Sequence, residues 1–270
     1  MPKRIPGRHF ARHFVERRSL IYQLVKRDFQ QRYVGSAAGW LWGLIHPLVL
    51  LGVYTYIFGV CLKQSPPADS GTASYSMFLF AGMLPWLLFA ETVQRSSSSI
   101  VEHANLVTKT MFPSEIVPVA ICLSSMVSHF LTVVLFVVIA AVGESHGSPA
   151  MLLLPVFVLL TGLLAVGIGW IAASLQVYLR DTAQLVAVVM TLWMWITPIM
   201  ILEDKIPEGL RFLLVINPLA YIVRAYRVIL LGSAMPSVRD MSIAAAYALT
   251  TFVIGGLFFR HMKRGFADVL

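Results

Sequence analysis

The feature that most constrains this chain is a series of six long stretches that are apolar and almost free of charge. They cover residues 39–62, 77–93, 116–142, 152–178, 183–202 and 241–259. A helix needs about 20 apolar residues to cross the roughly 30 Å hydrocarbon core of a bilayer. Only 13% of the 270 residues are charged, which is too few to cover a soluble domain of this size. The sequence therefore predicts an integral membrane protein.

The six runs are predicted to be helices. They lack the alternation of apolar and polar residues that barrel strands show, and a helix satisfies its own backbone hydrogen bonds within lipid. The expected fold class is all-α, with six transmembrane helices. Three parts follow along the chain: a cytoplasmic N-terminal segment at 1–37, the six-helix domain at 38–260 and a cytoplasmic tail at 261–270.

The distribution of Lys and Arg predicts the orientation. Most of the 21 cationic residues fall before the first run, between runs two and three, between runs four and five, or after the last run. Cytoplasmic loops carry such an excess, so both termini are expected in the cytoplasm. Topology thus accounts for the net charge of +8, and nucleic acid is not an expected partner. The first run lies behind a long polar and basic stretch without a cleavage site after it, so no removable signal peptide is expected.

A further apolar stretch, residues 212–231, is predicted to enter the membrane without crossing it. Its aliphatic side chains favour insertion by roughly 4–7 kcal/mol, whereas Arg224 and Arg227 oppose it by about 2.5–3.5 kcal/mol each. Pro218 follows Asn217 in mid-stretch, where it breaks the helix and frees carbonyls that lipid cannot satisfy. We expect a broken re-entrant helix pair between the fifth and sixth spans, at the outer side.

Residues 20–33 show the pattern of a helix that lies in the membrane interface. Ile21, Leu24, Val25 and Phe29 share one side of this helix, and the polar residues lie elsewhere. The candidate functional residues of this helix are Leu24, Arg27, Phe29, Arg32 and Tyr33. Two interpretations remain open: the helix is a topology anchor, or it also receives force from a cytoplasmic partner.

The entry to the first span carries a glycine at every fourth position. Gly35, Gly39 and Gly43 would form a smooth stripe on a helix, which permits close packing within the subunit or at a dimer seam.

Aromatic residues of the first and fifth spans are candidates for lining a wide channel. Their rings can stack on sugars, and they offer few charges that would trap them. An aromatic belt facing lipid is the alternative. The candidates are Trp42, Tyr54, Tyr56, Trp193 and Trp195.

The sequence contains no recognisable energy source. A phosphate-binding GxxxxGK[ST] loop is absent, and no chain of acids crosses the predicted bilayer as a proton relay. His46 and His129 stand alone, and Cys61 and Cys122 have no metal-ligand spacing. No catalytic constellation stands out. We therefore expect a partner to hydrolyse the fuel and to contact the loop at 94–115, although an ordinary connector is the alternative for this loop.

Several motifs in order carry a family resemblance: RDFQQRYVGSAAGWLWGLIHPL, LVTKTMFPSEIVP, YLRDTAQLV, ITPIMI and NPLAYIVRAYRVILLG. With the basic interfacial helix before them, they resemble the polysaccharide-export permeases of ATP-binding-cassette (ABC) transporters, over about residues 21–232. Each motif is short, and the specificity lies in their order and spacing. The first twenty residues and the loop SPPADSGTAS match poorly.

The resemblance implies a homodimer with two copies of a separate ATPase, which would hold ATP and Mg, so no cofactor is expected in this chain. It also implies that spans one and five line the channel and that the re-entrant pair forms an outer gate, with Asn217, Pro218, Arg224 and Arg227. We add that the two arginines could hold a lipid phosphate or an acidic sugar, with snorkelling as the alternative. The residues implied at the ATPase contact are Glu102, Asn105, Leu106, Lys109, Arg180 and Asp181. A local ion pair is the alternative for Arg180 and Asp181.

The expected function is export of a lipid-linked polysaccharide, O antigen or capsule, across the inner membrane. A periplasmic or outer-membrane protein is a further expected partner. The alternatives are a permease for teichoic acid, a drug or a small lipid and, from another class, a membrane enzyme of polyprenyl-linked sugar metabolism. The enzyme is disfavoured because Glu91, Asp181 and Asp240 are too scattered to form a site.

Overall fold

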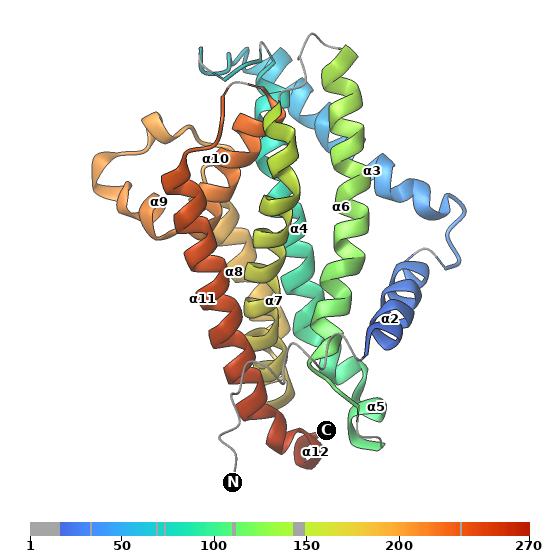
Figure 1. Ribbon diagram of the computed structural model, residues 1–270. Helices are drawn as coiled ribbons and strands as arrows, with labels where there is room; N and C mark the ends of the chain where they lie inside the picture. The colour runs from blue at the N-terminus through green and yellow to red at the C-terminus, as the bar shows by residue number, and fades with distance from the viewer. Residues whose placement is uncertain are drawn as a thin grey trace.

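All the regular secondary structure in the described part of the computed structural model is helical. The described part comprises residues 17–32, 34–68, 70–72, 74–109, 112–142, 149–232 and 234–270, without the side chains of residues 108, 109 and 267. All its regular elements are helices, which confirms the expected all-α class. Figure 1 shows a bundle of long helices with the short helices α5 (Ala104–Lys109) and α12 (Phe266–Val269) at one end. We call this the lower end, and the opposite end the upper end.

Five stretches are helical, long and apolar enough to cross a bilayer. They contain α3 (Trp42–Tyr54), α4 (Tyr75–Glu102), α6 (Ile116–Val142), α7 (Leu154–Tyr178) and α11 (Val238–Met262). All five correspond to predicted runs. The helix α4 continues well beyond the run at 77–93, through a run of four serines at 96–99. Ser97 and Ser99, for example, donate to the carbonyl oxygens three residues earlier, at 2.6 and 2.7 Å.

The fifth predicted span is shorter than expected. Its helix α8 (Thr182–Ile196) has 15 residues and ends before the predicted boundary at residue 202. At 1.5 Å per residue it reaches only about 22 Å. The cause is Pro198, because a residue before proline avoids helical geometry, and Thr197 accordingly has extended backbone angles (φ −79°, ψ 137°).

The predicted break in the stretch after α8 is confirmed. Helix α9 (Phe212–Ile216) and helix α10 (Pro218–Leu230) meet at a bend of 86° on either side of Asn217. The Asn217 side chain caps α10 by accepting a hydrogen bond from the Leu219 N–H at 3.0 Å, and Pro218 occupies the first helical position, where it needs no donor. Figure 1 shows α10 in the upper half of the bundle beside α11.

The core of the bundle is built around α4, which contacts α6, α7, α8 and α10. Of its most apolar window, 89% is buried within the chain, against 11% for the first span, which contains α3. Phe80, Phe89 and Phe136 are among the fully buried side chains of this core. Helix α4 is thus the hub of the bundle, and α3 remains largely uncovered.

Close approach between α7 and α11 depends on two glycines. A Cβ atom at Gly167 would lie 2.5 Å from the Thr251 carbonyl oxygen, and one at Gly255 would collide with the Gly167 backbone. Small residues at such crossings let helix backbones touch within a membrane.

The predicted glycine stripe before the first span is wrong for two of its three residues. Gly35 and Gly39 have positive φ angles of 79° and 52°, and each faces open space. These angles are allowed for glycine and strained for other residues. Instead of packing against a helix, the two glycines bend the chain between α2 (Arg18–Gln31) and α3.

Candidate functional site

Four charged side chains form a closed ring that joins α2 to α4. Asp28 and Arg32 belong to α2 and its C-cap, and Glu91 and Arg95 belong to α4. Two short ion pairs cross between the helices, Arg32 Nη1 to Glu91 Oε1 at 2.5 Å and Arg95 Nη2 to Asp28 Oδ1 at 2.5 Å. Two longer pairs, Arg32 to Asp28 at 3.6 Å and Arg95 to Glu91 at 3.8 Å, close it along each helix. We call these four residues the ion-pair ring.

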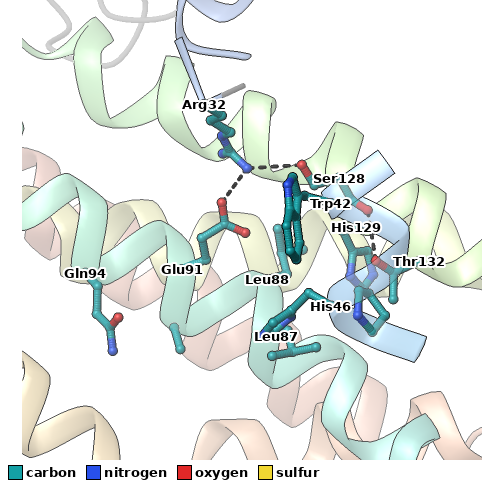
Figure 2. Close-up of a pocket in the computed structure, with 13 residues that line it drawn as sticks. Arg32, Trp42, His46, Leu87, Leu88, Glu91, Gln94, Ser128, His129 and Thr132 are labelled. Carbon is teal, nitrogen blue, oxygen red and sulfur yellow. Dashed lines mark hydrogen bonds and ion pairs between the residues drawn. The ribbon is translucent and has the colours of Figure 1, made fainter. Parts of the chain in front are cut away.

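Arg32 also reaches a third helix. Its guanidinium donates to Ser128 Oγ of α6 at 3.0 Å (Figure 2). It also donates to Ser125 Oγ of the same helix at 2.9 Å. The Arg32 side chain is only 14% exposed. Hydrogen bonds to a charged group contribute about 1.5–3 kcal/mol each when they are shielded from water. The end of α2 is therefore fixed to both α4 and α6.

The other candidate residues of α2 lie on two different faces of the helix. Leu24 and Phe29 are half-buried, on the side that faces α6, whereas Arg27 is exposed. Tyr33 lies outside the described residues. The helix thus has one packed face and one open face, as a helix at an interface requires.

A cavity of about 420 Å³ lies beside Arg32, between α3, α4 and α6 (Figure 2). Trp42 and His46 line it from α3, and Gln94 and Thr132 line it from α4 and α6. His129 lies at its inner wall, where its Nε2 atom is 3.1 Å from the Tyr226 hydroxyl of α10. His129 is buried and is a hydrogen-bonded packing residue, as expected from its isolation in the sequence.

The aromatic candidates of the first and fifth spans differ in exposure. Trp42, Tyr56 and Trp195 are exposed by 52%, 64% and 56%. Tyr54 is buried, with its ring 6.4 Å from that of Phe58. Trp193 is half-buried and packs edge-on against Phe89 of α4, at 5.2 Å between ring centroids. In the single chain, therefore, three of these rings lie at the surface and two face the core.

Trp193 and Asn217, which were separate candidates in the sequence, meet at the end of α8. The Trp193 indole N–H donates to Asn217 Oδ1 at 3.0 Å, and the Asn217 amide donates to Thr197 Oγ1 at 2.9 Å. Since Asn217 also caps α10, one buried amide joins the end of α8 to the start of α10. Pro218 is buried beside it. We call Trp193, Thr197 and Asn217 the α8–α10 junction.

Arg224 has two acidic partners. Its guanidinium binds the Glu203 carboxylate in bidentate fashion, at 2.6 and 2.8 Å, and lies 3.9 Å from Asp240 of α11. Glu203 belongs to the connection between α8 and α9, so Arg224 holds this connection to α10 and α11.

Arg227 points into the protein, and snorkelling does not describe it. Only 8% of the residue is exposed. It donates to the carbonyl oxygens of Phe78 at 3.3 Å and Ile199 at 2.8 Å, and its guanidinium lies 3.9 Å from the Phe78 ring centroid. A Cβ atom at Gly82 would lie 2.8 Å from Arg227 Nη2, so the glycine leaves the space that the guanidinium occupies. Arg227 joins α10 to α4 and to the chain after α8.

The candidates for an ATPase contact gather at the lower end. Glu102, Asn105, Arg180 and Asp181 are exposed, and Leu106 is half-buried. The side chain of Lys109 is outside the described part. Arg180 and Asp181 lie in the turn between α7 and α8. The turn that carries both is held by Gln176, which donates to the Arg180 carbonyl at 2.8 Å and accepts from the Ala183 N–H at 2.6 Å.

No group of three or more metal-ligating side chains occurs among the described residues. The observed sites instead join helices to one another, through the ion-pair ring, the α8–α10 junction and the two arginines of α10.

Known proteins resemble the chain over most of its length. The family model described as ABC-2 type transporter matches residues 19–231. The chain belongs to the ABC-2 type transporter family. Such a transporter has a partner ATPase, and this chain is its multi-pass membrane permease and not an enzyme.

Named relatives align almost end to end. The O-antigen export system permease protein RfbA of Myxococcus xanthus is 26% identical over 96% of this chain and 98% of that protein. A protein of the same name from Klebsiella pneumoniae is 25% identical, over 93% of this chain and 95% of its own length. The polysialic acid transport protein KpsM of Escherichia coli is 22% identical, over 88% of this chain and 91% of its own.

The ion-pair ring was missed by the sequence reasoning. Its signal is two oppositely charged pairs at i,i+4 spacing, Asp28 with Arg32 and Glu91 with Arg95. Such a pair is common on a solvated helix and therefore gives no warning that two helices share it.

Proposed function

We propose that this chain is the permease subunit of an ABC exporter that moves lipid-linked polysaccharide, O antigen or capsule, across the inner membrane. The relatives named for O-antigen export and polysialic acid transport support this substrate class, because their alignments cover most of each chain. The lower end faces the cytoplasm in this proposal, as the excess of Lys and Arg on that side favours.

The observation that carries the proposal is the uncovered surface of α8. Of its 15 residues only Thr182 and Met190 are buried within the chain, and Trp195 projects from it. An apolar helix this open needs lipid or protein around it. A second copy of the chain, placed with α3 and α8 of each copy facing one another, would enclose an aromatic-lined path with few charges. Sugars stack on such rings, and the path would not hold them tightly.

The contacts support a route for force from the partner ATPase. ATP and Mg are expected on that partner, and α5 with the α7–α8 turn is the proposed surface that receives its movement. Because Asn217 joins α8 to α10, a shift of α8 would carry the re-entrant pair with it and open the upper end. A periplasmic or outer-membrane partner would then receive the glycan.

Complementation of a deletion strain tests the proposal, with surface polysaccharide as the readout. Trp195→Ala should lower export strongly, while Trp195→Phe retains a ring and most of the activity. Leu192→Ala is the matched control, because Leu192 is 60% exposed on the same helix and has no ring. Equal export by all three variants would exclude the aromatic path. Normal glycan with new drug sensitivity in the deletion strain would favour a drug permease.

A further inference from the structure

The segment after α11 turns beneath the bundle and packs against α5. Phe266 of α12 is 1% exposed, and its ring lies 5.5 Å from that of Phe259 and 6.2 Å from that of Tyr178. It belongs to an apolar cluster that includes Ile100 at the end of α4 and Val107 of α5. Helices α12 and α5 touch directly. Phe266 thus fills the space between α5 and the ends of α7 and α11.

Glu115, which precedes α6, is held by the same segment and by α7. Lys263 pairs with the Glu115 carboxylate at 2.5 Å, and the Trp170 indole N–H donates to the Glu115 carbonyl at 3.0 Å. The Tyr178 hydroxyl donates to the Met262 carbonyl at 2.9 Å. A helix as short as α5 is not stable by itself, because nucleation costs more than six residues return. It therefore relies on its neighbours, and among the described residues it contacts α12 and α4.

The surface around these contacts has the make-up of a protein interface. Leu179 and Val269 are apolar and exposed, by 62% and 46%. The segments that meet here also carry exposed charged residues, namely Glu102, Arg180, Asp181, Arg264 and Asp268. An apolar centre with a polar rim is typical of surfaces that bind another protein. This surface is continuous with α5 and with the α7–α8 turn.

We infer that residues 262–270 form, with α5 and the α7–α8 turn, one composite docking surface for the ATPase subunit, and that Phe266 holds α5 at the height required for coupling. The inference rests on the proposed use of the lower end by the ATPase. It adds a third segment to that surface and a positioning residue within it.

Photocrosslinking tests the surface directly in the assembled transporter. A benzoylphenylalanine is introduced at Asp268, at Asn105 of α5 or at Met235, which is exposed at the upper end. Illumination of membranes should join positions 268 and 105 to the co-expressed ATPase, and position 235 should give no such product. A product from 105 without one from 268 would overturn the inference. No product from either lower-end position would instead refute the proposed use of the lower end.

Substitution tests the positioning role. Phe266→Ala should weaken ATPase capture by about tenfold, a change of about 1.4 kcal/mol, and should uncouple ATP hydrolysis from export. Phe266→Leu should restore most of both, and Met235→Ala, at an exposed position of the upper end outside this surface, should change neither. Thermal unfolding of the isolated permease separates misfolding from lost docking. Unchanged capture and unchanged export per ATP in a folded Phe266→Ala transporter would exclude the role. Neither readout depends on which glycan is carried.

Discussion

Removal of one carboxylate should release α2 from the bundle. Glu91 is the acceptor for Arg32 at 2.5 Å and lies 3.8 Å from Arg95. Glu91→Gln keeps the shape of the side chain and removes its charge. Arg32, which is 14% exposed, then keeps its two serine contacts and only the longer 3.6 Å pair with Asp28. The substitution therefore leaves a largely shielded cation without its closest counter-charge.

The magnitude follows from the burial of the ring. Pairs on an open surface contribute about 0.2–1 kcal/mol, and breaking a fully buried pair costs about 3–5 kcal/mol. Arg32 and Glu91, at 14% and 35% exposure, lie between these limits, so we expect a loss of about 2 kcal/mol. For a protein of this size that loss lowers the apparent melting temperature by about 4–8 °C. In a double-mutant cycle with Arg32→Gln, the coupling energy should exceed about 1 kcal/mol.

Hydrogen exchange in detergent provides the structural readout. Glu91→Gln should speed the exchange of α2 amides and leave α7 unchanged. Glu208→Gln is the control, because Glu208 is 91% exposed and its pair with Arg211 spans 4.0 Å, so neither melting nor exchange should respond. A coupling energy near zero together with unchanged exchange in α2 would show that the ring does not hold the helix.

Three further substitutions test the other helix contacts. Asn217→Ala should destabilise the protein by about 2 kcal/mol and impair export. Trp193→Phe removes only one hydrogen-bond donor and should cost about 1 kcal/mol. Equal melting temperatures for both variants and the parent protein would contradict the α8–α10 junction. Gly255→Leu should abolish the folded peak in size-exclusion chromatography, because the new side chain would collide with the Gly167 backbone. Gly209→Ala, which lies in open space, should keep that peak. An intact peak for Gly255→Leu would disprove the close crossing of α7 and α11. Arg227→Met should lower the melting temperature more than Arg227→Lys, because a lysine can still donate a hydrogen bond to one of the two carbonyl oxygens. The reverse order would contradict a guanidinium that points into the protein and binds these carbonyls.

The structural features that could be predicted from the sequence are those caused by residues close together in the chain. The bend at Asn217 was predictable because proline disrupts the helix in which it lies. The early end of α8 was predictable from Pro198 in the same way, but the predicted span was drawn through this proline to residue 202. The helical stripe predicted for Gly35 and Gly39 was wrong, because a spacing of four residues does not reveal whether a glycine has a positive φ angle. The inward course of Arg227 could not be predicted, because its carbonyl partners are brought together only by the packing of α4 against α10.

The distribution of contacts separates the parts of the bundle that must move together from those that are free to shift. Helix α4 is buried on all sides, continues into α5 with only His103 between them, and is joined to α2 by the ion-pair ring. A push on α5 therefore acts on α4 and on every helix packed against it. The first span and α8 bury little surface within the chain, so their displacement costs few of its internal contacts. In the proposed dimer, opening along these two helices would therefore break few contacts within each subunit, and the α8–α10 junction is the contact through which it would reach the core.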